Sequence, residues 1–229
     1  ATKSTKIDLE HFNPTFQRFS SLGAYVSNQY IAKHPDFLPT LNKNILSCKP
    51  VGISLDENTF DVLKRISEDI QQWVDSPMVI AAIVKANTQH NDISDTEILA
   101  LDEKWRSEVK SNQLVLISSV LENDLSHYLK KIKQDANGLF SEIFIMDNKG
   151  LNVGQSDITS DFWQGDEDKF QNSFSTPNNK PFIDDIEYDA SSQTFQSQVS
   201  LPIIAPDTKT KIGAITVGIN IEKALNKIQ

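Results

Sequence analysis

Two acidic and two aromatic side chains lie within six consecutive residues, 161–166, which read DFWQGD. Carboxylates at Asp161 and Asp166 can hold an ammonium group or, with a suitable partner, exchange protons. The indole of Trp163 offers a small ligand an apolar face and one N–H donor. With Phe162 and Gln164 as neutral contacts, this segment predicts a binding site for a small molecule.

Each of these side chains also has a structural interpretation. Trp163 can be a core anchor that holds its segment on a sheet. Asp161 can cap a helix that starts at Phe162, since Asp is a strong cap. Asp166 allows both interpretations, and the sequence leaves them open.

Further candidate ligand-binding residues lie nearer the C-terminus. Asp184 and Asp185 are adjacent in a predicted strand, so at most one faces a pocket; Asp185 is the candidate, together with Tyr188. Gln198 in the next strand shares a face with Gln196 and can reach a polar ligand. All of these side chains can equally lie on a solvated outer face.

Basic side chains are scarce around these acids. The nearest candidates are Lys149, Lys169 and Lys180, and no arginine is expected in the pocket. A carboxylate ligand normally needs a guanidinium or several backbone N–H groups. The sequence therefore favours an amine or a neutral ligand.

Catalytic chemistry is not predicted. The sequence has no glycine-rich phosphate loop, no nucleophile elbow and no histidine pair at metal spacing. Its four histidines fall in the predicted helical half, away from the strand pocket. Acids crowd residues 157–168 without the spacing of a calcium loop, and a lone cysteine, Cys48, excludes a thiolate zinc site. We expect a non-catalytic protein without a metal or cofactor.

Composition narrows the class of partner. The chain has 229 residues, 38% of them hydrophobic, and a formal net charge of −9. Nucleic acid and anionic lipid both bind clustered Lys and Arg, so neither is an expected partner. The longest apolar runs, such as residues 78–84, are too short to cross a bilayer, so no membrane insertion is expected. The polar start at Ala1 suits a mature product without its signal peptide, or an excised segment.

The first half of the chain has helical periodicity. Residues 1–55 are predicted to be a helical extension, in which aromatic residues from Phe12 to Tyr30 mark a helix that either packs on the rest or presents an interaction surface. Asp56, Ser76-Pro77 and the capping box at 94–97 predict three further helix starts. A last long helix is predicted from Ser111 to Asp135, ending at Asn137-Gly138.

After Gly138 the hydrophobic period changes from 3.6 to 2. The turn Asp147-Asn148-Lys149-Gly150 predicts a hairpin. The pattern predicts an α+β protein, in which N-terminal helices and one long helix pack on a five-stranded antiparallel sheet. The predicted strands cover residues 142–146, 151–156, 182–188, 194–204 and 212–221. A pocket is expected between this sheet and the crossover at 157–179.

The runs EIFIMDNKGLNVGQSDITSDFWQGDEDKF, TFQSQVSLPI and IGAITVGINIE closely resemble PDC-type, single Cache-like sensor domains over residues 76–225. These are PAS-like, extracytoplasmic modules of bacterial signalling proteins. The resemblance implies a sensor domain at 56–229, with a helical part at 56–137 and a PAS-like sheet at 138–229. It also implies a periplasmic location and ligands such as carboxylates, amino acids and amines. Members often carry Tyr where this chain has Phe162, so a hydroxyl contact to ligand would be missing here.

Two functions are therefore in competition. The first is a periplasmic small-molecule-sensing domain, either free-standing or the excised ectodomain of a receptor. The second is a protein-interaction or dimerisation module with a vestigial pocket, in which a homodimer or a signalling partner replaces the ligand. A hydrolase is a distant third, because no catalytic partner accompanies the acids.

Overall fold

The computed structural model describes residues 54–111, 113–189 and 194–227. The chain divides into two units, residues 1–53 and 54–229. The predicted N-terminal extension, including its helix from Phe12 to Tyr30, thus lies outside the described residues except for its last two positions. The candidate site and all elements that position it belong to the second unit.

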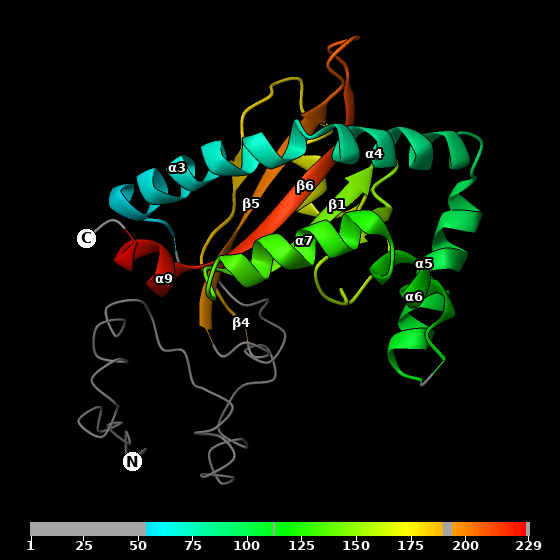
Figure 1. The fold of residues 1–229 in the computed structure, drawn as a ribbon, viewed down its shortest axis with the longest axis horizontal. Helices are drawn as coiled ribbons and strands as arrows, with labels where there is room; N and C mark the ends of the chain where they lie inside the picture. The colour runs from blue at the N-terminus through cyan, green and yellow to red at the C-terminus, as the bar shows by residue number, and fades with distance from the viewer. Residues whose placement is uncertain (1–53, 112, 190–193, 228–229) are drawn as a thin grey trace, which may run out of the picture. The chain divides into compact units, whose positions relative to one another are not determined.

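Helices form the first half of this unit (Figure 1): α3 Glu57–Val74, α4 Pro77–Gln89, α5 Asp95–Val109, α6 Val115–Leu121 and α7 Asp124–Asp135. Three starts follow the predicted signals. Asp56 accepts from the Thr59 N–H at 2.7 Å, Pro77 opens α4, and Ser94 and Glu97 form the capping box of α5. Local capping chemistry thus fixes where these helices begin.

The helix predicted from Ser111 to Asp135 is corrected to two helices, α6 and α7. The side chain of Asn123 caps α7 by accepting from the Ser126 N–H at 2.8 Å, and its Nδ2 donates to the Val153 carbonyl at 2.9 Å. This cap starts a new helix where the sequence pattern alone reads as continuous.

The second half of the unit forms one antiparallel sheet with the order β2-β1-β6-β5-β3, in which β4 also pairs with β5. Its strands are β1 Phe140–Asp147, β2 Asn152–Gln155, β3 Phe182–Ile183, β4 Glu187–Asp189, β5 Thr194–Ile204 and β6 Lys211–Asn220. The α+β class is confirmed. The sheet has six strands rather than five because the strand predicted at 182–188 is two short strands, β3 and β4.

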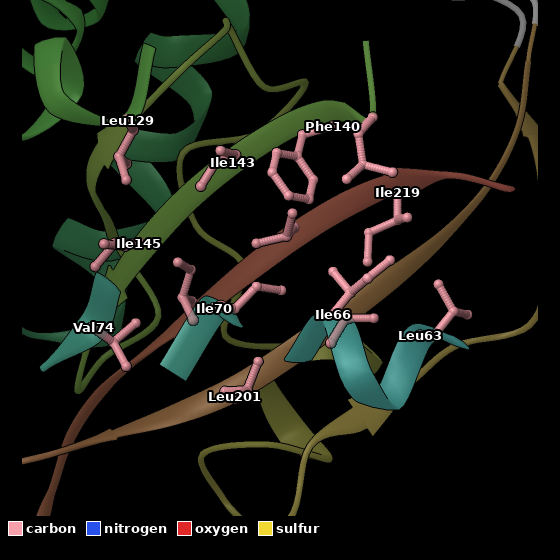
Figure 2. Close-up of a cluster of buried hydrophobic side chains, with 14 of the residues drawn as sticks. Leu63, Ile66, Ile70, Val74, Leu129, Phe140, Ile143, Ile145, Leu201 and Ile219 are labelled. Carbon is pink, nitrogen blue, oxygen red and sulfur yellow. The ribbon is translucent and has the colours of Figure 1, made fainter. Parts of the chain in front are cut away.

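One face of the sheet packs against α3, α4, α7 and the C-terminal helix α9, Ile221–Asn226. Figure 2 shows Leu63, Ile66 and Ile70 of α3 pointing toward Leu201 and Ile219 of the sheet. Because these side chains are at most 5% exposed, each contributes roughly 1.5–3 kcal/mol of apolar burial. This core leaves the opposite face of the sheet to the crossover.

The crossover between β2 and β3 covers part of that opposite face. Its short helix α8, Asp168–Gln171, places Phe170 with Phe174 against Phe144, Met146 and Ala214 of the sheet. Its earlier part joins α5 and α6 in a separate apolar cluster that contains Trp105 and Phe162. Among the described residues, the helices are all too short or too polar to span a bilayer.

Candidate functional site

A bulge in β1 brings two polar side chains to the face under the crossover. Phe140 pairs with Ile219 and Glu142 pairs with Gly218, so Ser141 is the extra residue. A Cβ on Gly218 would lie 2.3 Å from Ser141 Oγ and 3.0 Å from Glu142 Cγ. The missing side chain at Gly218 therefore makes room for both polar groups on one face.

Polar side chains continue across β5 and β6 on this face. Gln198 Nε2 donates to Glu142 Oε1 at 2.9 Å, and Ser141 Oγ donates to Gln196 Oε1. The buried hydroxyls of Ser200 and Thr216 share a hydrogen bond of 2.9 Å. An apolar sheet face would need none of these groups, so this region differs from the packed core on the other side.

Two further carboxyls border these residues from the β3–β4 segment. The N–H of Asp184 donates to the Gln198 carbonyl at 2.9 Å, and Glu187 pairs with Gln196 in the sheet register. We call the whole set the polar strip: Ser141, Glu142, Asp184, Glu187, Gln196, Gln198, Ser200 and Thr216. Asp185, the predicted candidate, has an exposed side chain, so Asp184 is the acid of this pair that the structure brings to the strip.

The surroundings of the polar strip disfavour the ionised form of two of its carboxyls, Asp184 and Glu187. Burial raises the pKa of Asp184, and the charges of Asp185 and Asp168 raise it further. Burial also raises the pKa of Glu187, and the neighbouring Asp184 adds to the effect. Both carboxyls thus ionise less readily than in water.

Lys169 of α8 offsets only part of the upward pKa shifts of Asp184 and Glu187. Its ammonium lowers the pKa of both Asp184 and Glu187, without reversing either shift. Its Nζ is 2.8 Å from a carboxylate oxygen of Glu167 and lies 5.5 Å from the ring centroid of Phe144. The charge of Lys169 is therefore shared with a further acid, and negative charge predominates around the polar strip.

The predicted site residues of the crossover lie elsewhere, against α5. Asp102 Oδ1 accepts from the backbone N–H groups of Phe162 and Trp163 at 2.9 and 3.0 Å. Arg106 bridges two carboxylates, with Nη2 at 2.6 Å from Asp102 and Nε at 2.8 Å from Asp161. The expectation that no arginine lies near these acids is wrong, because Arg106 approaches from a helix 55 residues earlier in the chain.

Aromatic contacts complete this attachment. Phe162 is 4% exposed and stacks on Trp105, with ring centroids 5.3 Å apart. Trp163 forms a bridge with Leu151, and its Nε1 donates to the Lys149 carbonyl at 2.8 Å. These contacts support the anchor interpretation of Trp163, since its N–H already has a partner.

Hydrogen bonds to two backbone carbonyls fix Gln164 beside Trp163. Gln164 is 2% exposed; its N–H donates to the Gly150 carbonyl at 2.8 Å and its Nε2 donates to the Asp161 carbonyl at 2.9 Å. The alternative that Asp161 caps a helix is wrong, because no helix begins at Phe162 and the next one, α8, starts at Asp168.

The structure thus separates the eight predicted residues into groups. Asp161, Phe162, Trp163 and Gln164 lie together near α5, and Gln198 belongs to the polar strip. The side chains of Asp166, Asp185 and Tyr188 are exposed, and the Tyr188 ring meets Phe195 edge-on at 5.3 Å. Sequence reasoning missed Glu142 and Glu187 of the strip, and only the i,i+4 spacing of Asp102 and Arg106 signalled that pair.

One histidine of the helical half contacts the first hairpin of the sheet. His90, at the end of α4, places Nδ1 2.6 Å from Asp147 Oδ2. Asp147 also accepts from the backbone N–H groups of Lys149 and Leu151 within the predicted hairpin turn. In the part of the chain that the structure describes, no group of three or more His, Cys, Asp or Glu is arranged for metal binding.

Comparisons with known proteins give structural likenesses alone, because no family model and no curated protein matches the chain. The sensory domain of the Campylobacter jejuni chemoreceptor Tlp3 matches 73% of this chain and 66% of its own length, at 15% identity and a TM-score of 0.37. The same domain in complex with L-valine matches 76% of this chain and 67% of its own, at 17% identity and a TM-score of 0.33.

The sensor domain of the V. cholerae histidine kinase DctB matches 74% of this chain and 60% of its own length, at 13% identity and a TM-score of 0.31. The chain thus spans about two thirds of the length of these structures or less. They are sensory domains of a chemoreceptor and a histidine kinase.

Proposed function

We propose that this chain is a non-catalytic sensory module that binds a small, ammonium-bearing molecule on the polar strip, beneath the 157–179 crossover. One observation carries the proposal: Asp184, which is half-buried, and Glu187, which is exposed, are neighbouring acids of the strip, and both have raised pKa values. Among the described residues, neither forms an ion pair with a lysine, arginine or histidine. Carboxyls whose pKa is perturbed by burial and by neighbouring charges are candidates for functional sites.

An ammonium ligand would supply the missing positive charge. A cation near a carboxylate favours the ionised form, so its binding offsets the desolvation of both acids. The amide side chains of Gln196 and Gln198 provide neutral donors and acceptors for the rest of the molecule. Lys169 sets a limit, because a second cation close to its ammonium would be repelled; one ammonium group per ligand is therefore favoured.

A sensory role follows from the place of this site. The crossover that covers the sheet face is attached to α5 through Asp102, so ligand-induced movement of the crossover reaches the helical part of the unit. We infer an extracytoplasmic location and a downstream signalling partner, in keeping with the family that the sequence resembles. The ligand itself is an amine rather than a carboxylate, because the polar strip holds acids and no arginine.

A thermal-shift screen tests the proposal with matched pairs of compounds, each a primary amine and its N-acetyl derivative. At about 100 times its dissociation constant, a binding amine stabilises the protein by about 2.7 kcal/mol. Acetylation removes the charge and should abolish the shift. Asp184→Asn should weaken the shift, whereas Asp207→Asn, at an exposed position whose charge does not act on Asp184 or Glu187, should preserve it.

Results of the opposite kind would contradict the proposal. These are equal shifts from an amine and its acetylated form, or equal losses in both variants. If no compound of a broad amine panel shifts the unfolding temperature, the ligand-binding function is wrong.

A protein-interaction module is the second candidate, and exposed apolar side chains of α4 favour it. Met78 and Val84 are 45% and 48% exposed on a helix without acidic residues. If the chain forms a homodimer through this helix, Val84→Glu should convert it to a monomer in sedimentation velocity. If the native chain is a monomer with and without an amine, and the amine raises its unfolding temperature, the sensory function is favoured instead.

A further inference from the structure

Two buried amide side chains of β2 face the crossover. Phe144 pairs with Gln155 and Met146 pairs with Asn152, which leaves Val153 as the extra residue of a bulge. The bulge turns Asn152 and Gln155 to the same face as Phe144 and Met146, although three positions separate them. Asn152 is 3% exposed and Gln155 is fully buried.

Each amide has an atom without a hydrogen-bond partner. Asn152 Nδ2 donates to Thr159 Oγ1 at 3.0 Å and to the Asp161 carbonyl at 3.1 Å, which fixes the orientation of this amide. Its Oδ1 has no partner within the described part of the chain, and the same holds for Gln155 Nε2. Buried polar groups are nearly always paired, because leaving them unpaired costs free energy.

Thr159 does not satisfy the second amide. Its hydroxyl lies 3.5 Å from Gln155 Oε1 but 2.7 Å from the Asp161 carbonyl, and it has one proton to donate. Reversing the Gln155 amide would let Nε2 donate to Thr159 and would leave Oε1 unpaired instead. One atom of Gln155 therefore lacks a partner in either orientation.

We propose that this cluster binds a hydroxylic oxygen, one that donates to Asn152 Oδ1 and accepts from Gln155 Nε2. Water and the hydroxyl of an alcohol both combine a donor and an acceptor on one atom. An anion would be repelled by Asn152 Oδ1, and a metal ion by the Gln155 N–H. Asn152 Nδ2 lies 3.0 Å and Gln155 Oε1 lies 3.5 Å from Thr159 Oγ1, so the two amide side chains belong to one cluster.

The bound oxygen joins β2 to the crossover. Thr159 and Asp161 belong to the crossover, and the Thr159 carbonyl accepts from Trp105 Nε1 of α5 at 2.9 Å. The site therefore lies where the sheet, the crossover and α5 meet. It is independent of the proposed function, because it involves no residue of the polar strip.

High-resolution crystal structures of the full chain test the inference directly, one without any alcohol and one after a soak in ethanol. We expect an oxygen within about 3.2 Å of Asn152 Oδ1 and of one amide atom of Gln155. A water in both crystals identifies an internal water, and its replacement by ethanol identifies a site for alcohols. Absence of any oxygen at this position in both crystals overturns the proposal.

Oxygen-17 relaxation dispersion in solution counts long-lived internal waters without crystals. If the occupant is water, Gln155→Leu should lose one such water relative to the native chain. The matched control, Gln134→Leu, alters an exposed amide of α7 and should keep the native number. An unchanged number in folded Gln155→Leu, as judged by far-UV circular dichroism, contradicts the assignment of water.

Discussion

Asp102 stabilises two segments that are distant in the sequence. Its carboxylate accepts from two backbone N–H groups of the crossover, pairs with Arg106, and is 6% exposed at its side chain. Charge-assisted hydrogen bonds of this kind are stronger than neutral ones. Asp102 thus supplies two of the hydrogen bonds that attach the crossover to α5.

Asp102→Ala should lower the free energy of unfolding by about 2–3 kcal/mol, because it leaves two N–H groups without an acceptor. Urea denaturation followed by tryptophan fluorescence measures this loss. Glu103→Ala, a change at the exposed neighbouring position, should stay within about 0.5 kcal/mol of the native chain. Equal stabilities of the two variants would show that the crossover is held by other contacts.

Asp184 should make stability depend on pH in a defined direction. Because its pKa is raised in the folded state, that state binds the proton more tightly than the unfolded chain. Stability from this group is therefore present at low pH and is lost as pH rises through the interval between its ordinary and its raised pKa. Binding of an amine should change in the opposite sense and strengthen over the same interval.

Asp184→Asn should remove this loss of stability. At pH values above the raised pKa of Asp184, the variant should therefore have a higher unfolding temperature than the native chain, and at pH values below the ordinary pKa it should not. Melting curves across the acidic range measure the difference. Asp207→Asn provides the control, since its side chain is exposed and is not among the groups that shift the pKa of Asp184, so it should leave the pH profile unchanged. Identical profiles for the native chain and both variants would contradict the argument.

The crossover is also attached at its far end, through a lysine of β6. Lys211 Nζ donates to the carbonyls of Ser173, Phe174, Thr176 and Asn178 at 2.6–3.1 Å. The first half of the crossover is held by α5 and the second half by β6. The crossover that covers the polar strip is therefore fixed at both ends.

Lys211→Met should loosen the second half of the crossover while the sheet persists. Amide hydrogen exchange over residues 173–178 should accelerate about tenfold or more, because the lost charge-assisted hydrogen bonds are worth about 1.5–3 kcal/mol. Lys180→Met, at an exposed position two residues after this segment, should leave the exchange rates as they are. Equal rates in both variants would mean that these carbonyls do not hold the segment.

Local signals made much of this architecture predictable. Ser94 and Glu97 stand three residues apart, and the hairpin turn needs only Asp147 and the positive φ of Gly150. Interactions between distant residues were not predictable in this way. The bond from Phe162 to Asp102 spans 60 residues, and no periodicity encodes it.

Bulges explain why the candidate site was predicted less well than the fold. Simple alternation places Ser141 and Glu142 on opposite faces, and it does the same for Asn152 and Gln155. An extra residue in β1 and another in β2 reverse these assignments. A shift by one residue exchanges the faces of a strand, so the polar groups under the crossover could not be assigned from the pattern alone.

At the scale of the molecule, the site and its supporting helices lie within residues 54–229. This unit contains its own core, in which α3, α4, α7 and α9 cover one face of the sheet. We therefore predict that a chain starting at Ser54 folds by itself and keeps the response to amines.

Circular dichroism melts and the thermal-shift screen, applied to both chain lengths, measure this. The shorter chain should unfold in one cooperative transition and give the same amine-dependent shift as the full chain. A non-cooperative melt would mean that residues 1–53 are required for folding, and loss of the shift alone would mean that they contribute to the site.

The four carbonyls around Lys211 make the conformation of residues 173–178 depend on a distant residue. Backbone oxygens of residues 173–178 surround an ammonium group, much as an ionophore surrounds its cation. This ammonium belongs to a strand 33–38 residues further along the chain. The shape of this loop is thus encoded partly in β6. Substitutions at position 211 should consequently alter the cover of the polar strip while leaving every residue of the strip in place.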